Sequence, residues 1–421
     1  MMFSKLSVMP LLASLTAARF VAYIDQDHNS TLPSKSLTGE IDHVILAFVQ
    51  SSMLYNESTI VKWWDLPKIK SHFKENTTFM VSIGGDPDFK QGFHKAVQSD
   101  ESRKSYARKV ANFVKREGFD GVDIDWKYPG GITENETVEI RGFPSLLQEI
   151  RKAIGKNMTL SIASPGVKKY MHAYTRQHAP NIFNAVDFLN ILTEDQMDNF
   201  SNTTDYLSGI SSCNDTISAY LELGMPPEKG NLGMPFYGQG YSVEPDCKHG
   251  LGCKVVKPGE KKGKVVGQVS SFMWTAMYMD ANPPSKNASV AKDGEMCGPD
   301  TKKICPGKAC CSPSGYCGTT EDYCGWNCLP AWGHCNGSTS IGSFQKARKD
   351  KSAVTDQGAF YLDKENNFFW TWDPAENYGD KYHTVIKDNK LGGVMVWSLG
   401  EDSYDWSHLK KLSAVIKQHR M

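Results

Sequence analysis

Short apolar runs rich in β-branched residues alternate with amphipathic stretches along most of the chain. Between the runs, apolar residues recur at helical spacing, as in Tyr106, Val110 and Phe113. Strands that are apolar on both faces and are each followed by a helix predict a parallel sheet covered by helices, and eight such strands close a (β/α)8 barrel. The eight runs occupy residues 19–24, 43–49, 79–85, 121–126, 158–164, 186–193, 231–237 and 392–399.

The regular spacing breaks once, between the seventh and the eighth run. About 150 residues separate these two runs, whereas one strand–helix unit needs roughly 30. We therefore expect an insertion in a loop on the face of the barrel where the strands end. The predicted organisation is a barrel over residues 19–281 and 340–421, with a small inserted module at residues 297–335.

The start of the chain has the pattern of a cleaved secretory signal. Lys5 precedes an apolar core from Leu6 to Leu15, and small residues follow up to Ala18. No later segment has the roughly 18 consecutive apolar residues of a membrane span, so we expect residues 1–18 to be removed and the protein to be secreted. Ten Asn-x-Ser/Thr acceptor sites predict a glycosylated surface. They lie at Asn29, Asn56, Asn76, Asn135, Asn157, Asn199, Asn202, Asn214, Asn287 and Asn336.

The charge composition excludes the strongly basic and strongly acidic protein classes. The 421 residues carry 47 Lys and Arg against 47 Asp and Glu, so the net charge is zero. Such a chain lacks the basic excess by which proteins bind nucleic acid or anionic membranes. We expect a soluble monomer with neither of these partners.

Eleven cysteines are distributed unevenly. Eight of them lie between residues 297 and 335, which in an oxidising compartment predicts a module held together by disulfides. Cys247 and Cys253 are close enough to close a short loop, and Cys213 is left over, either as a buried free thiol or as a competitor for one of these two. Zinc is the other use of clustered cysteines, but the chain lacks paired Cys-x2-Cys knuckles, so we expect no metal and no cofactor.

The segment GFDGVDIDWKYPGG, residues 118–131, carries acidic residues along one predicted strand. Residues two apart on a strand point to the same face, so Asp123, Asp125 and Lys127 would project together into the barrel and toward its mouth. Carboxylates are costly to bury, and inside a barrel they indicate a functional site. The alternative is a structural cluster satisfied by backbone and hydroxyl donors.

This segment resembles the catalytic motif of the glycoside hydrolase family 18 chitinases, and specifically of their secreted fungal type. The family motif is Asp-Gly-x-Asp-x-Asp-x-Glu; residues 120–125 match it, and Lys127 stands in place of the glutamate. Three further segments resemble motifs of the family in the same order along the chain. They are VSIGG (81–85), MPFYG (234–238) and LGGVMVWSLGEDS (391–403).

The resemblance implies a mechanism in which the N-acetyl group of the substrate is the nucleophile. The glutamate protonates the leaving oxygen, and Asp125 orients the acetamido group. Lys127 is a poor proton donor, because the neighbouring carboxylates favour its ammonium form and raise a pKa that is already about 10.4. The residues implied to line the groove are Trp397, as the floor under the sugar, Tyr237, Tyr23 and Phe48.

A second departure from the family lies at the end of the sixth run, in NILTEDQ. The family has a tyrosine that bonds the acetamido group where this chain has Glu194, and the following aspartate is kept as Asp195. A Lys127–Glu194 ion pair across the barrel mouth is therefore expected. Asp86 stands where a tryptophan is common and Gln239 where a basic residue is common, so the groove has also lost stacking surface.

Residues 297–335 resemble the hevein-like chitin-binding module, with CCSPSGYCGTTEDYCG at their centre. The resemblance implies that Ser312, Tyr316 and Tyr323 bind N-acetylglucosamine, and Ser314 stands where an aromatic residue is frequent, which predicts weaker but intact binding. So small a module buries little apolar surface, and its disulfides should supply most of its stability. The implied pairs are Cys297–Cys311, Cys305–Cys317, Cys310–Cys324 and Cys328–Cys335.

Together these features predict a secreted, chitinase-like protein that binds chitin or chitooligosaccharides and has lost hydrolysis. One alternative is an active chitinase in which Glu194 or Asp123 replaces the missing acid. Another is a subunit that docks on a chitinous wall and delivers something else.

Overall fold

The structure is a computed structural model. It describes residues 18–29, 32–86, 88, 91–131, 136–262, 265–266, 269–273, 284–285, 287–292, 295–299, 301–403 and 405–420. The expected secretory signal lies outside these ranges apart from Ala18. Within them, no helix is both long enough and apolar enough to cross a membrane.

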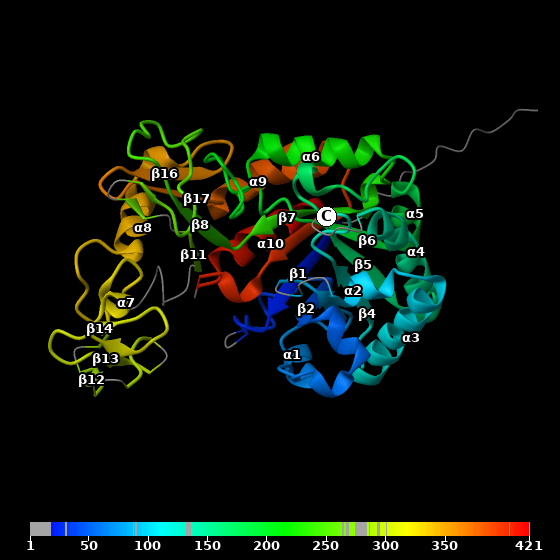
Figure 1. Cartoon of the computed structure of the whole chain (residues 1–421), viewed down its shortest axis with the longest axis horizontal. Coiled ribbons are helices and arrows are strands. Elements are labelled where there is room, and N and C mark those ends of the chain that lie inside the picture. The colour runs from blue at the N-terminus through cyan, green and yellow to red at the C-terminus, as the bar shows by residue number, and fades with distance from the viewer. Residues whose placement is uncertain are drawn as a thin grey trace, which may run out of the picture.

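Eight parallel strands close into a barrel in the order β1-β18-β7-β6-β5-β4-β3-β2 (Figure 1). Each strand lies within two residues of a run in the sequence analysis, so the prediction of a (β/α)8 barrel is confirmed. The strands are β1 (Arg19–Asp25), β2 (His43–Val49), β3 (Thr78–Gly84), β4 (Gly121–Asp125), β5 (Thr159–Ser164), β6 (Phe188–Ile191), β7 (Gly230–Pro235) and β18 (Gly393–Trp397).

Helices cover the outside of the barrel (Figure 1). They are α1 (Leu66–Lys70), α2 (Gln91–Ala96), α3 (Asp100–Glu117), α4 (Glu136–Ile154), α5 (Ala179–Ala185), α6 (Ile210–Glu222), α9 (Tyr378–Lys381), which runs on into a π-helical segment (Tyr382–Lys387), and α10 (Ser407–Arg420). Helix α3 shows how the sequence sets the bounds of these elements. A capping box between Ser99 and Ser102 starts it, and Gly118 ends it with a φ of 78°, a conformation that glycine adopts without strain.

The two faces of each barrel strand enter different cores. In β4, Val122 and Ile124 are buried in the layer between strands and helices, while the alternate residues Asp123 and Asp125 belong to the barrel interior. The sequence analysis predicted this inward direction for both aspartates. It follows from the two-residue period of a strand whose apolar face packs on helices.

A second sheet lies between β7 and β18 in the chain, beside the barrel (Figure 1). Its four antiparallel strands are ordered β11-β8-β17-β16, with β8 (Tyr237–Ser242), β11 (Val269–Met273), β16 (Ala359–Asp363) and β17 (Phe368–Trp372). A two-stranded ribbon of β9 (Lys261–Lys262) and β10 (Val265–Val266) lies in the same insertion. The sequence analysis did not predict this sheet and included its residues in the barrel ranges, because β8 follows β7 with only Phe236 between them.

The cysteine-rich region forms small strand pairs held by disulfides. Its elements are β12 (Ser289–Val290), β13 (Lys303–Ile304), β14 (Cys310–Cys311), β15 (Cys317–Gly318) and α7 (Glu321–Cys324). The disulfides are Cys297–Cys311, Cys305–Cys317, Cys310–Cys324 and Cys328–Cys335, the pairs that the hevein-like resemblance implies, and a fifth joins Cys247 to Cys253. Cys213, on α6, is free and buried.

The cysteine-rich region is attached to the second sheet and stands away from the barrel (Figure 1). Trp326 packs on Phe368 of β17, with ring centroids 5.1 Å apart, and its carbonyl accepts a hydrogen bond from Ser340 N at 2.7 Å. Ser340 begins α8 (Ser340–Lys349), which packs Phe344 against Trp370 and Trp372 of the same sheet. The region is therefore docked on the sheet through aromatic contacts.

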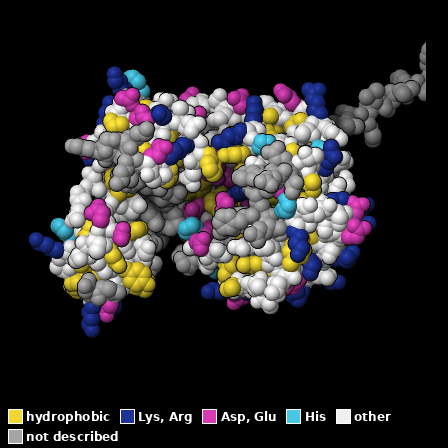
Figure 2. All heavy atoms as spheres, viewed as in Figure 1, with side chains coloured by type: hydrophobic (Ala, Val, Ile, Leu, Met, Phe, Trp, Pro, Cys, Tyr) yellow, Lys and Arg dark blue, Asp and Glu magenta, His cyan; other side chains and the backbone are white. Residues whose placement is uncertain are grey.

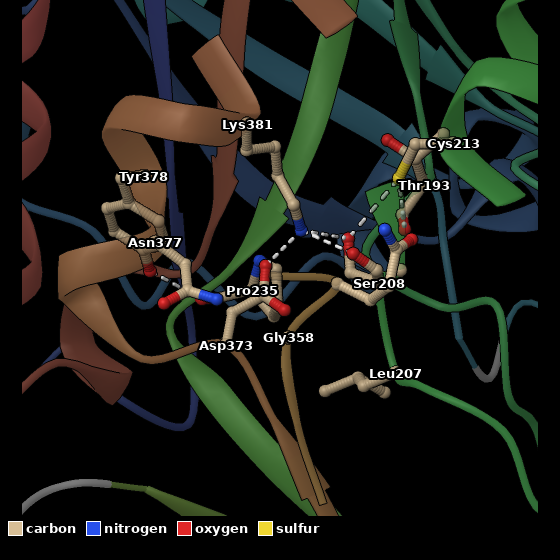
Figure 3. A network of polar contacts seen from close by, with 12 residues as sticks. Thr193, Leu207, Ser208, Cys213, Pro235, Gly358, Asp373, Asn377, Tyr378 and Lys381 are labelled. Carbon is tan, nitrogen blue, oxygen red and sulfur yellow. Dashed lines mark hydrogen bonds and ion pairs between the residues drawn. The ribbon is translucent and has the colours of Figure 1, made fainter. Parts of the chain in front are cut away.

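A buried ion pair joins the second sheet to the barrel (Figure 3). Lys381 of α9 pairs with Asp373, the residue after β17, and its ammonium group also donates to Ser208 Oγ at 3.0 Å. Ser208 lies in the loop between β6 and α6, and the Cys213 thiol lies 3.6 Å from its hydroxyl. This network fixes the loop that begins after β6 against the second sheet.

Candidate functional site

The carboxyl ends of the barrel strands surround a cavity of about 250 Å³. All eight strand–loop junctions meet at this end of a parallel barrel, so side chains distant in sequence come together there. Eight of the nine residues predicted for the barrel site line the cavity, and Asp123 lies one step deeper on β4. The eight are Tyr23, Phe48, Asp125, Lys127, Glu194, Asp195, Tyr237 and Trp397.

Asp123 is fully buried, and its carboxylate accepts three hydrogen bonds. Ser161 Oγ donates to Oδ1 at 2.6 Å, while Ser82 Oγ and Tyr23 OH donate to Oδ2 at 2.8 and 2.9 Å. Burial raises the pKa of Asp123, and the three hydroxyl donors oppose that rise. With its oxygens occupied, Asp123 links β4 to β1, β3 and β5 and does not face a ligand.

Asp125, the last residue of β4, is 3% exposed and lines the cavity. Its Oδ1 has no hydrogen-bond partner among the described residues, and its Oδ2 lies 3.9 Å from Lys127 Nζ. Burial raises the pKa of Asp125 to about 7, although the charge of Lys127 opposes the rise. At neutral pH this carboxyl group is therefore partly protonated, and its Oδ1 is buried without a hydrogen-bond donor.

The ammonium group of Lys127 lies between two carboxylates just beyond β4. Lys127 Nζ is 3.8 Å from Asp86 Oδ2 and 3.9 Å from Asp125 Oδ2. Burial by itself would lower the pKa of Lys127, but the charges of the surrounding groups, Asp125 first, outweigh it and the pKa is raised. Lys127 is therefore a cation at neutral pH.

Two glycines at the end of β3 allow this close approach. A Cβ at Gly84 would lie 1.9 Å from the carbonyl oxygen of Asp125, and one at Gly85 would lie 2.4 Å from the ring of Phe48. Both glycines have left-handed φ values, 111° and 76°. Gly85 N donates to Asp125 O at 2.9 Å, so the VSIGG segment positions the end of β4 from which Lys127 projects.

Glu194 follows β6 and is 2% exposed. Its Oε2 has no hydrogen-bond partner in the described part of the chain and fills the space where a side chain at Gly233 of β7 would lie. Burial, and after it the charge of Asp195, raises the pKa of Glu194 well above its usual range. Burial and the charge of Asp195 therefore both favour the protonated form of this carboxyl group.

The expected ion pair between Lys127 and Glu194 is not found among the described residues. Glu194 has no cation within 4 Å there, and Lys127 pairs with Asp86 and Asp125 instead. The reason is the direction of the Glu194 side chain, which packs over Gly233 toward β7. Asp86, placed by the glycines at the end of β3, takes the position near the ammonium group.

Aromatic residues form the apolar wall of the cavity. The Trp397 ring stacks on Phe48, with centroids 5.3 Å apart and planes inclined by 18°, and lies 5.3 Å from the Tyr23 ring at a larger tilt. The Tyr237 hydroxyl donates to Asp195 Oδ1. These four aromatic residues and the carboxyl groups beside them form a surface suited to a ring with an apolar face and polar edges.

A second cavity of about 460 Å³ adjoins the first and shares Asp86, Asp125, Lys127, Asp195 and Gln239 with it. Its wall adds Tyr128 and Tyr170, which stack with centroids 4.9 Å apart, and Phe200, which is 72% exposed. The two cavities make one groove with Lys127 between them.

Sequence reasoning missed these three aromatic residues because two lie in loops and Tyr170 ends a 3-10 helix of three residues, Lys168–Tyr170, and no periodicity marks such segments. Each follows a barrel strand closely, at the end of the barrel where the site lies, and that position is the signal that could have identified them.

Four further titratable residues that the sequence analysis missed line the first cavity, Asp25, Asp27, His28 and Glu401. His28 Nδ1 lies 2.8 Å from Asp25 Oδ1 and 3.9 Å from Glu401 Oε1, and the Ser398 hydroxyl donates to Asp25 Oδ2 at 2.5 Å. Burial raises the pKa of Glu401 to about 8, against the charge of His28. This cluster joins the end of β1 to the loop after β18.

Comparison with known proteins identifies the family. A family model described as glycosyl hydrolases family 18 matches residues 19–402, which is most of the chain. The chain belongs to family 18. The resemblance of the chain to glycoside hydrolase family 18 is thereby confirmed.

Curated family 18 relatives match over part of their length. The chain is 26% identical over 249 residues to Chitotriosidase-1 of Mus musculus, covering 52% of this chain and 51% of that protein. It is 30% identical over 186 residues to Chitinase 1 of Aphanocladium album, covering 39% and 42%. The chain therefore spans about half of these relatives' length or less.

Solved family 18 structures share the fold over nearly the whole chain. An N-acetylglucosaminidase from Paenibacillus barengoltzii has a TM-score of 0.63 at 18% identity, covering 94% of this chain and 99% of that one. A mutant of the class V chitinase from Cycas revoluta, in complex with (GlcNAc)3, has a TM-score of 0.59 at 17% identity with the same coverage. At these identities the similarity shows a common fold.

The residues implied for the hevein-like region lie apart from the family 18 barrel, Ser312 and Tyr316 in the turn between β14 and β15 and Tyr323 in α7. Ser312 N donates to Tyr316 O at 2.9 Å, and Tyr316 N donates to Ser312 Oγ at 3.1 Å, so these two are held together. Tyr316 is 44% exposed. The Tyr323 ring packs against Gly318 and the disulfide cluster of Cys310, and is half-buried.

One group of possible metal ligands is found in the described ranges, the sulfur atoms of Cys297, Cys305 and Cys311. All three are in disulfides, so they have no thiolate with which to bind a metal.

Proposed function

We propose that this family 18 chain binds chitin or chitooligosaccharides and does not hydrolyse them. The observation that carries the proposal is Lys127, which stands at the position of the motif's glutamate and whose ammonium group lies between Asp86 and Asp125. Hydrolysis by the family's route needs a proton donor with a pKa near ambient pH, within hydrogen-bond reach of the glycosidic oxygen. A lysine whose pKa is raised keeps its proton, so the first step lacks its acid.

The groove retains features that favour sugar binding. Trp397, stacked on Phe48, offers an aromatic face for a pyranose ring, and Tyr128 with Tyr170 offers a second on the other side of Lys127. The ammonium group of Lys127 makes no hydrogen bond to its carboxylate neighbours at 3.8 and 3.9 Å, and so has donors for sugar oxygens. The chitinase from Cycas revoluta, with the same fold, was solved with (GlcNAc)3, which supports that class of ligand.

Turnover of a chitooligosaccharide tests the proposal. We expect the unaltered protein to retain chitin in a pull-down and to release no shorter products. Lys127→Glu should gain measurable turnover, because a general acid contributes about 10² to 10⁴ in rate, and Glu194→Tyr in the same chain should raise it further. Lys127→Met is the matched control, since it removes the ammonium group and supplies no acid. Cleavage by the unaltered protein that Asp125→Ala abolishes would overturn the proposal.

One observation favours an active chitinase as the second candidate. Glu194 lines the cavity as a buried carboxyl group with a raised pKa, the state required of a general acid. In that case the unaltered protein cleaves chitooligosaccharides, Glu194→Gln abolishes cleavage, and Lys127→Met leaves it in place. These two variants separate the candidates, because the binding proposal expects no cleavage in either.

We also propose that the protein is secreted, is glycosylated and carries a hevein-like chitin-binding module at residues 297–335. Disulfides persist in oxidising compartments, and the exposed Tyr316 beside Ser312 is suited to an N-acetylglucosamine ring. Two sites for one polymer raise the apparent affinity through effective concentration. If Tyr316→Ala abolishes the chitin pull-down and Trp397→Ala does not, binding belongs to the module alone, and the barrel groove has no part in it.

A further inference from the structure

The cavity at the barrel mouth has a large local excess of acidic groups. Seven carboxyl side chains line it, against one lysine and one histidine, Lys127 and His28. The chain as a whole has equal numbers of acidic and basic residues, and Figure 2 shows both kinds interspersed over the surface. The excess is therefore a property of this cavity, although Asp125 and Glu401, with pKa values raised to about 7 and 8, carry only part of their charge at neutral pH.

The two basic residues leave part of this acidic excess unpaired. Lys127 lies near Asp86 and Asp125, and His28 lies near Asp25 and Glu401. The other three carboxyl groups have no cation within 4 Å among the described residues. They are Asp27, Glu194 and Asp195.

Two buried carboxyl oxygens in the same cavity also lack hydrogen-bond donors. Asp125 Oδ1 and Glu194 Oε2 belong to side chains that are 3% and 2% exposed, and neither oxygen has a partner in the described part of the chain. Both residues line the cavity, but these two oxygens are themselves covered by protein atoms, so a ligand acts on them through its charge and not through a direct hydrogen bond. Carboxyl groups without compensating donors beside the cavity favour a cationic ligand group over a neutral one.

We propose that the barrel groove binds 2-amino-2-deoxyglucose units, as found in partly deacetylated chitin, in preference to N-acetylated units. The proposal rests on the proposed function and narrows its ligand. An ammonium group on the sugar supplies three donors and a positive charge, whereas an acetamido group supplies one donor, one acceptor and a methyl group. The apolar face of the ring stacks on Trp397 in either case, so selectivity comes from the nitrogen.

The ammonium ligand also changes the protonation of the carboxyl groups that it contacts. The groups facing Glu194 are Asp195, Asp125 and Lys127, and the Tyr237 hydroxyl lies on Asp195. A positive charge brought near Glu194 lowers its raised pKa, so binding favours release of a proton. An acetamido ligand brings no charge and releases no proton.

Isothermal titration with two hexamers of equal length, fully acetylated and fully deacetylated, tests the proposal near pH 6. The part of the binding that Trp397→Ala removes is assigned to the groove. We expect the deacetylated hexamer to bind the groove about 10- to 100-fold more tightly, the size of one or two charge-assisted hydrogen bonds. Titration in two buffers of different ionisation enthalpy should show proton release with this hexamer alone.

The variants used are Glu194→Gln, Asp86→Asn and Glu222→Gln. Glu194→Gln keeps the shape of the side chain and should reduce the preference about tenfold. Because Asp86 is exposed, Asp86→Asn should leave the fold intact. It should reduce the preference for the deacetylated hexamer about two- to fivefold. Glu222→Gln makes the same change as the first variant on the exposed face of α6 and should leave the preference unaltered.

The outcomes separate this inference from the function on which it rests. If the groove binds the acetylated hexamer as tightly as the deacetylated one, or more tightly, the preference is overturned while chitin binding stands. If Trp397→Ala alters the binding of neither hexamer, both the preference and the groove's part in the proposed function fail. If both Glu194→Gln and Asp86→Asn keep the full preference, the proposal is also overturned, because the carboxyl groups of Glu194 and Asp86 would then have no part in selectivity.

Discussion

The buried ion pair between Lys381 and Asp373 leads to a prediction of defined size. Lys381→Met removes the ammonium group and leaves the carboxylate of Asp373, which is 2% exposed, without its cation. Asp373 Oδ1 already lacks a hydrogen-bond partner among the described residues, so little is left to stabilise the charge. Removing one partner of such a pair costs about 3–5 kcal/mol in the free energy of unfolding, and we expect Lys381→Met to fall in that range.

The second partner distinguishes the ion pair from simple loss of packing. Burial raises the pKa of Asp373 and Lys381 opposes that rise, so the ionised carboxyl group is less stable when Lys381 is absent. Replacing both residues, as Lys381→Met with Asp373→Leu, leaves no buried charge and should recover most of the loss. The double variant should therefore be more stable than the single one.

Urea unfolding followed by tryptophan fluorescence measures these differences from the midpoint and slope of the transition. Lys349→Met is the matched control on the exposed end of α8, and surface changes of this kind stay within about 0.5 kcal/mol. If Lys381→Met costs no more than Lys349→Met, or if the double variant is no more stable than the single one, the assignment of a buried ion pair between sheet and barrel is wrong.

Three other predictions follow from contacts near the groove and the cysteine-rich region. Burial alone would lower the pKa of His28, but Asp25 and Glu401 raise it to about 9. Protonated His28 therefore stabilises the fold fully below its ordinary pKa of about 6.5, and this stabilisation is lost as the pH rises toward 9. The thermal midpoint of unfolding should fall over that pH interval, and His28→Asn should abolish this pH dependence. Gly233→Ala places a Cβ 1.8 Å from Glu194 Oε2 and 2.6 Å from Ile191 O, which should lower the free energy of unfolding by about 1–3 kcal/mol. Adding Glu194→Ala should recover only part of this loss, since the contact with the backbone oxygen of Ile191 remains. Trp326→Ala removes the ring that packs on Phe368 and should speed proteolysis of the segment between the cysteine-rich region and α8, while Tyr316→Ala, on an exposed ring of that region, should leave the rate unaltered.

Several parts of the site could be predicted from local pattern. The inward direction of Asp123 and Asp125 follows from the period of β4, and the need for glycine at Gly84 and Gly85 is visible in the VSIGG segment. The charged state of Lys127 follows from its acidic neighbours in the same strand. Each of these depends on residues close together in sequence, where period and spacing carry the information.

The pairing of charges across the barrel mouth could not be predicted in this way. Lys127 was expected to pair with Glu194, but the structure pairs it with Asp86 and Asp125, because Glu194 packs over Gly233. The empty space at a glycine on β7 has no signature in the segment that carries Glu194. The second sheet was missed for a similar reason, since pairing of β8 with β17 joins residues more than a hundred positions apart.

The barrel, the direction of its strands and the lysine among carboxylates can be read from the order of the residues, because the two-residue and 3.6-residue periods record which side chains face a core. Which charges neutralise one another depends on the folded arrangement. Burial and distance set the pairing, because groups from β1, β3, β4, β6 and the loop after β18 meet at one cavity. The protonation of these groups depends on the local excess of acidic residues there, which the zero net charge of the chain does not reveal.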